Sequence, residues 1–330
     1  MTDANTPDAT PQSSRPETDP ESLPVEEAAQ VSRNVISNVE DVIVGHHDEI
    51  EHVVTAMLGR GHVLLEDVPG VGKTMLARAL AASIECSFKR VQFTPDLLPS
   101  DITGVNVFNQ KTREFEFQKG PVFANVVLGD EINRAPPKTQ SALLEAMEEQ
   151  QVTVDGTTRM LPQPFTVIAT QNSVEPNRTY ELPLAEVDRF MKKLHLGYPD
   201  AAEESEVVAR AVGHHPIESL TSVTDTETIR RARETVANVT VKEAVREYGT
   251  RLAAYTRENA KLGVSPRGTI ALMRAAQARA VVRGRGYVTP EDVQTEASRV
   301  LSHRIRLSAS GPQDQGEQVV ADAIETVPVE

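Results

Sequence analysis

Short apolar runs alternate with helical patterns along the first two thirds of the chain. Five such runs lie at residues 62–66, 89–94, 125–130, 166–170 and 192–196. Strands that are apolar on both faces are typical of a parallel sheet covered on both sides by helices. The pattern therefore predicts an α/β domain with a five-stranded parallel sheet.

Helical spacing dominates on both sides of this segment. Apolar positions between Glu26 and Val39 recur at helical intervals, and residues 50–58 form a second amphipathic stretch. Beyond Pro199 the strand signals stop, and helical patterns cover residues 201–213, 225–237, 241–260, 266–282 and 290–303. The chain is therefore predicted to continue into a smaller, all-helical domain.

The two ends of the chain are acidic and poor in large apolar residues. Residues 1–28 consist mainly of Pro, Ser, Thr and acidic residues, which bury too little apolar surface to offset the entropy lost on ordering. We expect a disordered acidic tail there. Residues 309–330 contain no basic residue and few large side chains, which favours a second acidic tail, with a short docking helix at residues 319–324 as the alternative.

The formal net charge of −14 falls mostly on these ends. Residues 1–27 hold seven acids and one Arg, and residues 309–330 hold five acids, which leaves about −3 for the body. So small a charge argues against a strong nucleic-acid binder. The sequence has one Cys, no signal-peptide pattern and no run of about 18 apolar residues, so we expect a cytoplasmic protein without disulfides or membrane insertion.

The stretch EDVPGVGKT lies between the first predicted strand and an alanine-rich helical pattern. Such a turn directs backbone N–H groups and a helix N-terminus at one point, which suits a phosphate chain. Lys73 supplies positive charge for the β- and γ-phosphates, and the Thr74 hydroxyl suits magnesium. Asp67 replaces the first Gly of the pattern G-x-x-x-x-G-K-[ST]. Because Asp tolerates left-handed backbone better than most residues, we expect the turn to survive.

Two later strands end in polar residues that would complete a hydrolytic site. The stretch NVVLGDEINRA ends its apolar run at Asp130 and Glu131. Asp130 would reach the magnesium, and Glu131 would polarise a water that attacks the γ-phosphate. The stretch FTVIATQN ends at Asn172, an uncharged amide that would position both the water and the phosphate.

Arginines are the side chains best suited to charge that develops on a transferring phosphoryl group. Arg189 in AEVDRFM and Arg267 in GVSPRGTIALM are the candidates, and Arg134 is a rival for a role at the site of a neighbouring subunit.

The sequence offers little evidence for other kinds of catalytic or metal site. The two adjacent His pairs diverge on a helix or strand and make no metal site on their own, and no nucleophile triad or dinucleotide fingerprint is present.

The motifs VIVGHHDEI, EDVPGVGKT, LLPSDITG, GPVFANVVLGDEINRAPPKTQSALLEAMEE, VIATQN, ELPLAEVDRFM and SPRGTIALMRAAQARA follow one another in this order. In this order the chain resembles the MoxR-type AAA+ ATPases of the helix-2-insert group, which also holds the magnesium-chelatase motor subunits, over about residues 30–306. The resemblance implies an AAA+ nucleotide-binding domain at residues 29–199 and a helical lid at residues 200–308. It also implies two projecting hairpins, one at residues 104–120 inserted in helix 2 and one at residues 151–163.

The same resemblance assigns roles to residues. It implies catalytic roles for Glu131, Asn172 as sensor 1, Arg189 as the arginine finger and Arg267 as sensor 2, and a magnesium site at Thr74 and Asp130. The ATP-binding residues it implies are Val44, Gly45, Pro69, Gly70, Val71, Gly72, Lys73, Thr74 and Met75.

Three functions fit these patterns. The first, which the resemblance implies, is an ATP-driven ring, a hexamer by the same resemblance, that remodels a protein client or inserts its cofactor; von Willebrand A domain proteins are among such clients. The second is a nucleic-acid motor on a related fold. The third is a P-loop module that switches on nucleotide without steady turnover.

Overall fold

The computed structural model describes residues 20–172, 180, 182–212, 216–307 and 315–330. Its central sheet has five strands in the order β2-β5-β8-β1-β9, and every pair in it is parallel. The strands are β1 (Val63–Asp67), β2 (Phe88–Gln92), β5 (Val126–Asp130), β8 (Thr166–Asn172) and β9 (Lys192–Leu194). Each lies within or beside one of the predicted apolar runs, so the predicted sheet is confirmed.

The register of the sheet brings the carboxyl ends of its strands together. Asp67 at the end of β1 lies opposite Asn172 of β8, and Gln92 at the end of β2 lies opposite Asp130 of β5. Strands β5 and β8 are buried along most of their length, which explains their unbroken apolar runs. The polar residues at the strand ends therefore share one edge of the sheet.

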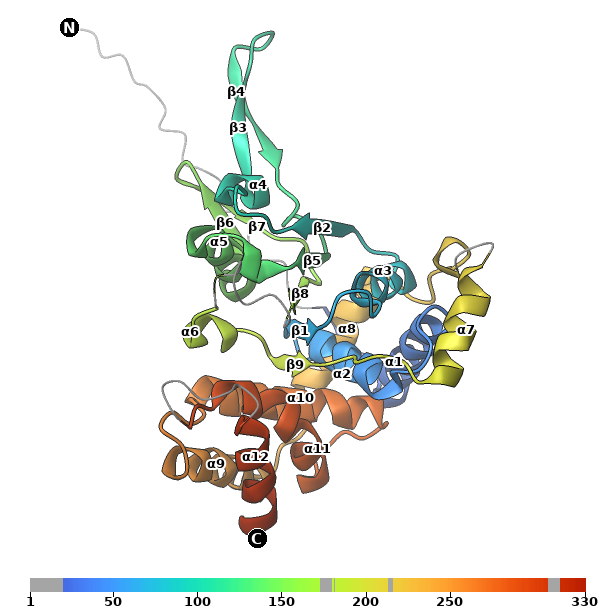
Figure 1. Cartoon of the computed structure of the whole chain (residues 1–330), viewed down its shortest axis with the longest axis vertical. Coiled ribbons are helices and arrows are strands. Elements are labelled where there is room, and N and C mark those ends of the chain that lie inside the picture. Colours follow the sequence, from blue (N-terminus) through green and yellow to red (C-terminus); the bar gives the residue numbers. More distant parts are fainter. Residues whose placement is uncertain (1–19, 173–179, 181, 213–215, 308–314) are drawn as a thin grey trace, which may run out of the picture.

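Helices cover both faces of the sheet (Figure 1). One apolar core lies between the sheet and α1 (Val25–Glu40), α2 (His47–Leu58) and α3 (Lys73–Ser83). A second core lies on the other face, against α5 (Pro137–Glu149). The shorter helical segments are α4 (Pro99–Thr103), η1 (Ile132–Arg134) and α6 (Leu184–Val187). This is the layered αβα domain that the apolar runs predict.

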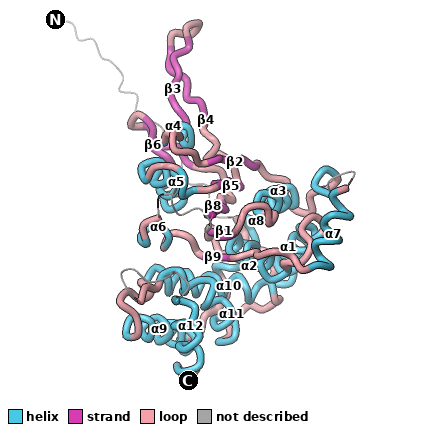
Figure 2. The backbone as a smooth tube through the Cα atoms, in the orientation of Figure 1, coloured by secondary structure: helices cyan, strands magenta, loops and turns pink. Residues whose placement is uncertain are grey.

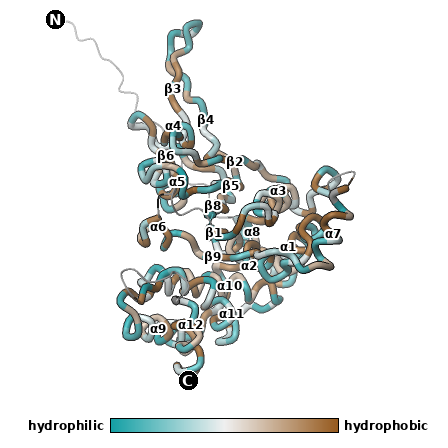
Figure 3. The backbone as a smooth tube through the Cα atoms, in the orientation of Figure 1, coloured by the Kyte–Doolittle hydropathy of each residue, from teal (hydrophilic) through white to brown (hydrophobic). Residues whose placement is uncertain are grey.

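Two antiparallel hairpins interrupt the αβα domain, as predicted (Figure 2). The first joins β3 (Gly104–Asn109) to β4 (Glu114–Lys119), and the second joins β6 (Gln151–Val154) to β7 (Thr157–Met160). The side chain of Asn106 donates to Asp155 at 2.7 Å and so links the two hairpins. The first hairpin extends away from the body, with hydrophilic residues at its tip (Figure 3).

The helical region contains a helix in each predicted range. The helices are α7 (Ala201–Ala211), α8 (Thr226–Ala237), α9 (Glu243–Glu258), α10 (Pro266–Val282) and α11 (Pro290–Leu301), with single turns at η3 (Pro216–Glu218) and η4 (Ser302–Arg304). Helices α7 and α8 lie against the sheet domain. Arg210 of α7 donates to two carbonyls at the end of α1, and the buried Arg233 of α8 donates to Met57 O and Thr166 Oγ1.

The C-terminal segment differs from the favoured prediction. Helix α12 spans Gln315–Thr326, and its Val319, Val320 and Ala323 are buried against α9, α11 and η4. The expectation of an acidic tail is therefore wrong for these residues, and the docking helix is the correct alternative. At the other end, Leu23 is buried and α1 begins at Val25, so order starts before residue 29; residues 1–19 lie outside the described part of the chain.

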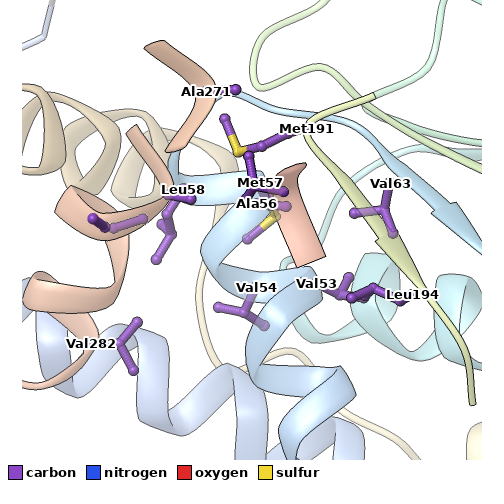
Figure 4. Close-up of a cluster of buried hydrophobic side chains, with 14 of the residues drawn as sticks. Val53, Val54, Ala56, Met57, Leu58, Val63, Met191, Leu194, Ala271 and Val282 are labelled. Atoms are coloured by element: carbon purple, nitrogen blue, oxygen red, sulfur yellow. The ribbon is translucent and has the colours of Figure 1, made fainter. Parts of the chain in front are cut away.

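The lid and the sheet domain share an apolar core. Ala271 and Val282 of α10 lie in the same buried cluster as Met57 of α2, Met191 and Leu194 (Figure 4). Ion pairs join the same surfaces, because Arg279 of α10 and Arg283, just after this helix, both reach Glu51 of α2. Within the described residues, no helix is both long enough and apolar enough to cross a bilayer.

Candidate functional site

The Gly-rich turn occupies the gap between the end of β1 and the start of α3. Gly70 and Gly72 have φ angles of 90° and 92°, a conformation that side-chain-bearing residues rarely adopt. Lys73 opens α3, and its Nζ donates to Asp67 O at 2.9 Å and to Val68 O at 3.0 Å. Burial lowers the pKa of Lys73, and the charges of Asp67, Asp130 and Glu131 oppose that effect. The lysine thus lies folded over the turn.

Asp67 keeps the turn intact for a different reason from the one predicted. It is the last residue of β1 and is not among the residues with positive φ. Its buried carboxylate accepts from Leu196 N at 2.6 Å and Gly197 N at 2.8 Å, and it also accepts from Val68 N. Asp67 therefore ties the turn to the segment after β9, and the left-handed positions fall on the two glycines.

A cavity of about 370 Å³ opens beside the turn at the carboxyl edge of the sheet. It brings together nine of the residues predicted for the site: Pro69, Gly70, Gly72, Lys73, Thr74, Met75, Asp130, Glu131 and Asn172. Val71 does not line it and packs against the apolar core instead. Val44 and Gly45 line a separate cavity of about 500 Å³ with Glu203 and Arg210 of α7.

Asp130 is held by two neighbours that the sequence reasoning missed. Thr170 Oγ1 donates to its Oδ1 at 2.7 Å, and Arg90 donates to its Oδ2 through Nε at 3.0 Å and Nη2 at 2.6 Å. Arg90 could have been found from its place on the predicted second strand. It lies two residues before Gln92, so the two side chains share one face of that strand. The Asp130 side chain therefore faces the cavity in a fixed orientation.

Glu131 has a left-handed backbone, with φ at 56°, and its N–H donates to Thr170 Oγ1 at 2.8 Å. Its Oε2 accepts from Gln92 Nε2 at 2.7 Å and from Arg134 Nη1 at 2.8 Å. Both donors lie in the same chain. The carboxylate that the sequence predicts as the base is therefore already bound on its cavity side by an amide and a guanidinium.

Arg189 and Arg267 lie elsewhere. Neither lines the cavity at the Gly-rich turn, and both line another cavity, of about 410 Å³, between the sheet domain and the lid. Glu148 near the end of α5 pairs with both: its Oε2 lies 3.3 Å from Arg189 Nε, and its Oε1 accepts from Arg267 Nη2. A single folded chain thus separates the two predicted arginines from the predicted phosphate cradle.

The segment that carries Arg189 is fastened to the lid. The buried Arg304 of η4 donates through Nε to Asp188 Oδ1 at 2.7 Å and through Nη2 to the carbonyls of Asp188 and Phe190. Burial lowers the pKa of Arg304 to about 10 although Asp188 opposes this, so the guanidinium stays charged at neutral pH. His214 and His215, and residues 173–179 after Asn172, lie outside the described residues.

Comparison with known proteins identifies both domains. Residues 62–192 match the family described as ATPase family associated with various cellular activities (AAA), and residues 252–325 match an AAA lid domain. A candidate ATPase from Cytophaga hutchinsonii has the same fold in its crystal structure, with a TM-score of 0.83 and 38% identity over 92% of this chain and 97% of that one. The fold and the cavity at the Gly-rich turn define an AAA+ ATPase, an ATP hydrolase.

Relatives over nearly the whole length specify the family. The protein YeaC of Bacillus subtilis, described as uncharacterised, is 52% identical over 88% of this chain and 90% of its own. Chaperone MoxR1 of Mycobacterium tuberculosis is 41% identical, covering 88% and 80%, and protein MoxR of Methylorubrum extorquens is 31% identical, covering 87% and 91%. The chain belongs to the MoxR family of AAA+ ATPases.

Proposed function

We propose that the chain assembles into a ring, a hexamer by family resemblance, and uses magnesium-dependent ATP hydrolysis to remodel or mature a protein client. The observation that carries the proposal is the single cavity lined by Lys73, Thr74, Asp130 and Glu131 at the edge of the sheet. The name of the relative chaperone MoxR1 supports a protein client. A cavity with these groups would hold a terminal phosphate between the Lys73 ammonium and a Mg²⁺ ion bound at the acid pair.

The cradle is formed by the turn and the start of α3. The N–H groups of the turn and the N-terminus of α3 would bind the phosphate chain, and Lys73 would leave the carbonyls of Asp67 and Val68 to pair with the β- and γ-phosphates. Val44 and Gly45 would contact the adenine, as the resemblance implies. Their separate cavity lies beside α7, so α7 borders the proposed base pocket.

The groups at Thr74 and Asp130 fit Mg²⁺. A hydroxyl and a carboxylate line one cavity, and Mg²⁺ prefers a few oxygen ligands completed by phosphates and water over a full protein cage. When bound, the ion would neutralise charge on the phosphates.

Glu131 would act as the base and Asn172 would position the attacking water. Gln92 and Arg134 both bind Oε2 of Glu131, so the water would be met by the other carboxylate oxygen or after one of these contacts is exchanged. The contact of Arg134 with Glu131 of its own chain favours Arg189 over Arg134 for the role at a neighbouring site.

Arg189 and Arg267 would act on the nucleotide of the adjoining subunit. Their shared cavity lies apart from the cradle of their own chain, so they would contact the γ-phosphate of another subunit once the subunits assemble. An arginine supplied in this way contributes roughly 10³- to 10⁵-fold to kcat. The position of the arginines thus supports the proposed ring arrangement.

The test is ATP hydrolysis measured against protein concentration. Specific activity should rise with concentration, Lys73→Ala and Glu131→Gln should abolish it, and Glu131→Gln should still bind ATP. Glu145→Gln, an exposed acid on α5, is the matched control and should be unaffected. Mixing Arg189→Ala with Lys73→Ala chains should restore partial turnover. Absence of hydrolysis at every concentration with intact ATP binding would favour the nucleotide-switched module instead.

The protein client would meet the hairpins. Phe108 and Phe115 form a cross-strand ring pair on the β3–β4 hairpin with centroids 5.3 Å apart, and they are 49% and 71% exposed. Exposed aromatic residues are typical of protein contact surfaces. Glu131→Gln chains loaded with ATP should retain the client, a von Willebrand A domain protein being one candidate. DNA binding that weakens steeply with salt would support the nucleic-acid motor instead.

A further inference from the structure

Glu148 is placed where three parts of the fold meet. It lies near the end of α5, Arg189 follows α6 in the sheet domain, and Arg267 lies in the first turn of the lid helix α10. One carboxylate oxygen reaches each arginine. The carboxylate is therefore a bridge between a core arginine and a lid arginine that are 78 positions apart in the sequence.

The bridge holds two like charges together. Two guanidinium groups placed side by side repel each other, and a carboxylate between them offsets this repulsion. The cavity contains five arginines, Arg60, Arg189, Arg267, Arg274 and Arg304, and two carboxylates, Glu148 and Asp188. Asp188 is already engaged by Arg304, so Glu148 is the acid that serves Arg189 and Arg267.

The geometry leaves Arg189 ready for another acceptor. Arg189 Nε is at ion-pair distance from Glu148, 3.3 Å, but it lacks the angles of a hydrogen bond and is buried without another acceptor among the described residues. Because Nε is buried beside Glu148, a phosphate from another subunit would meet the rest of the guanidinium, on a side chain that is 28% exposed overall. A terminal phosphate offers three acceptor oxygens and a larger charge than Glu148 does.

We propose that Glu148 is a positioning residue that holds Arg189 and Arg267 side by side as a two-guanidinium receptor for the terminal phosphate of the adjoining subunit's nucleotide. The inference rests on the proposed function above and adds a residue to it. Glu148 does not contact the nucleotide. It belongs to the subunit that supplies the arginines, so its loss should behave as a defect of the arginine face and not of the phosphate cradle.

The kinetic test compares Glu148→Ala and Glu148→Gln with Arg189→Ala. Misplacing a catalytic group costs up to about 100-fold, so Glu148→Ala should lower kcat by tens of fold, less than Arg189→Ala does. The KM for ATP should change by no more than about twofold, because the cradle is intact. Glu148→Gln keeps one acceptor oxygen and should lie between Glu148→Ala and wild type. Glu149→Ala, the exposed next residue, is the control and should match wild type.

Mixed rings decide which face Glu148 serves. Glu148→Ala mixed with Lys73→Ala should recover turnover, because the first chain supplies an intact cradle and the second supplies intact arginines. Glu148→Ala mixed with Arg189→Ala should recover none, because both defects lie on the arginine face. Recovery in the second mixture would overturn the inference by placing Glu148 at the cradle of its own chain.

Two controls separate this inference from the proposed function. If wild type is inactive, the proposed ATP hydrolysis is wrong. If Arg189→Ala mixed with Lys73→Ala gives no rescue, the proposed action of Arg189 at a neighbouring site is wrong. If that rescue occurs and Glu148→Ala with Lys73→Ala does not recover, Glu148 has no positioning role and the inference alone is wrong. Should the Ala variant not fold, Glu148→Gln takes its place in both mixtures with the same expected pattern.

Discussion

A buried ion pair joins the lid to the sheet domain. Glu296 of α11 and Lys192 of β9 have no exposed side-chain surface, and Lys192 Nζ lies 2.6 Å from Glu296 Oε2. Lys192 Nζ also reaches Thr55 Oγ1 at 2.5 Å and His52 Nδ1 at 3.2 Å. Burial alone would raise the pKa of Glu296, but the charge of Lys192 and the contact with His52 outweigh it and lower that pKa to about 2. The carboxylate is therefore ionised at neutral pH.

The cost of breaking this pair follows from its burial. Removing one partner of a buried pair leaves the other charge without compensation and costs about 3–5 kcal/mol. Because Thr55 and His52 remain beside Lys192, Glu296→Gln should lie at the low end, about 3 kcal/mol. The double variant Lys192→Met with Glu296→Leu removes both charges and should lose much less, since apolar replacements of buried pairs are often neutral.

Urea unfolding at pH 7 measures these differences. The single variants Glu296→Gln, Glu296→Leu and Lys192→Met and the double variant Lys192→Met with Glu296→Leu form the set, and the double variant should be more stable than each single variant. Glu247→Gln, which loses an exposed pair with Arg251 at 4.0 Å, is the control and should change the unfolding free energy by less than about 1 kcal/mol. Single losses that add up in the double variant would refute the argument, because additivity means that the charges do not depend on each other.

Two further predictions concern stability. Burial lowers the pKa of His62 to about 4, with the charge of Arg233 contributing, and the folded ring accepts a hydrogen bond from Val167 N at 2.9 Å. Because the unfolded pKa near 6.5 is the higher one, this stability is complete above pH 6.5 and is lost as the pH falls towards 4. Between pH 7.5 and pH 5 wild type should lose about 2 kcal/mol more unfolding free energy than His62→Gln, and equal losses would contradict it. Asp67→Ala should cost about 2 kcal/mol in thermal unfolding, because the buried N–H of Leu196 and the half-buried N–H of Gly197 lose their acceptor; an unchanged midpoint would show that the tie is dispensable.

Local pattern was enough for most of the fold. Short apolar runs between helical patterns predicted the five parallel strands. The turn from β1 to α3 was predicted with its glycines and Lys73 because these features act within a few residues. The sequence did not show which distant residues would contact each other in the folded chain. Asp67 was expected to tolerate a left-handed turn, whereas its role depends on backbone groups about 130 positions later in the chain. Helix α12 likewise depends on a surface formed by α9 and α11, which its own sequence does not encode.

The order of the motifs assigned roles to two arginines but did not show where they lie in the fold. Arg189 was expected to serve the site of an adjoining subunit and Arg267 to act as sensor 2, and both line a cavity that the Gly-rich turn does not share. What brings them together is Glu148, a residue of α5 that no linear pattern distinguishes from the adjacent Glu149. Contacts of this kind arise from the packing of the lid on the core, so only the folded chain reveals them.

The contacts around Arg189 bear on how a ring of such chains would work. Asp188, before Arg189, is bound by Arg304 of the lid, and Lys192, after it, is bound by Glu296 of the lid. The arginine is thus held from both sides by buried groups of the helical domain. A movement of the lid must therefore either break two buried ion pairs or carry Arg189 with it, and the second costs far less. Where Arg189 serves a neighbour, the lid of one subunit is then mechanically connected to hydrolysis in the next.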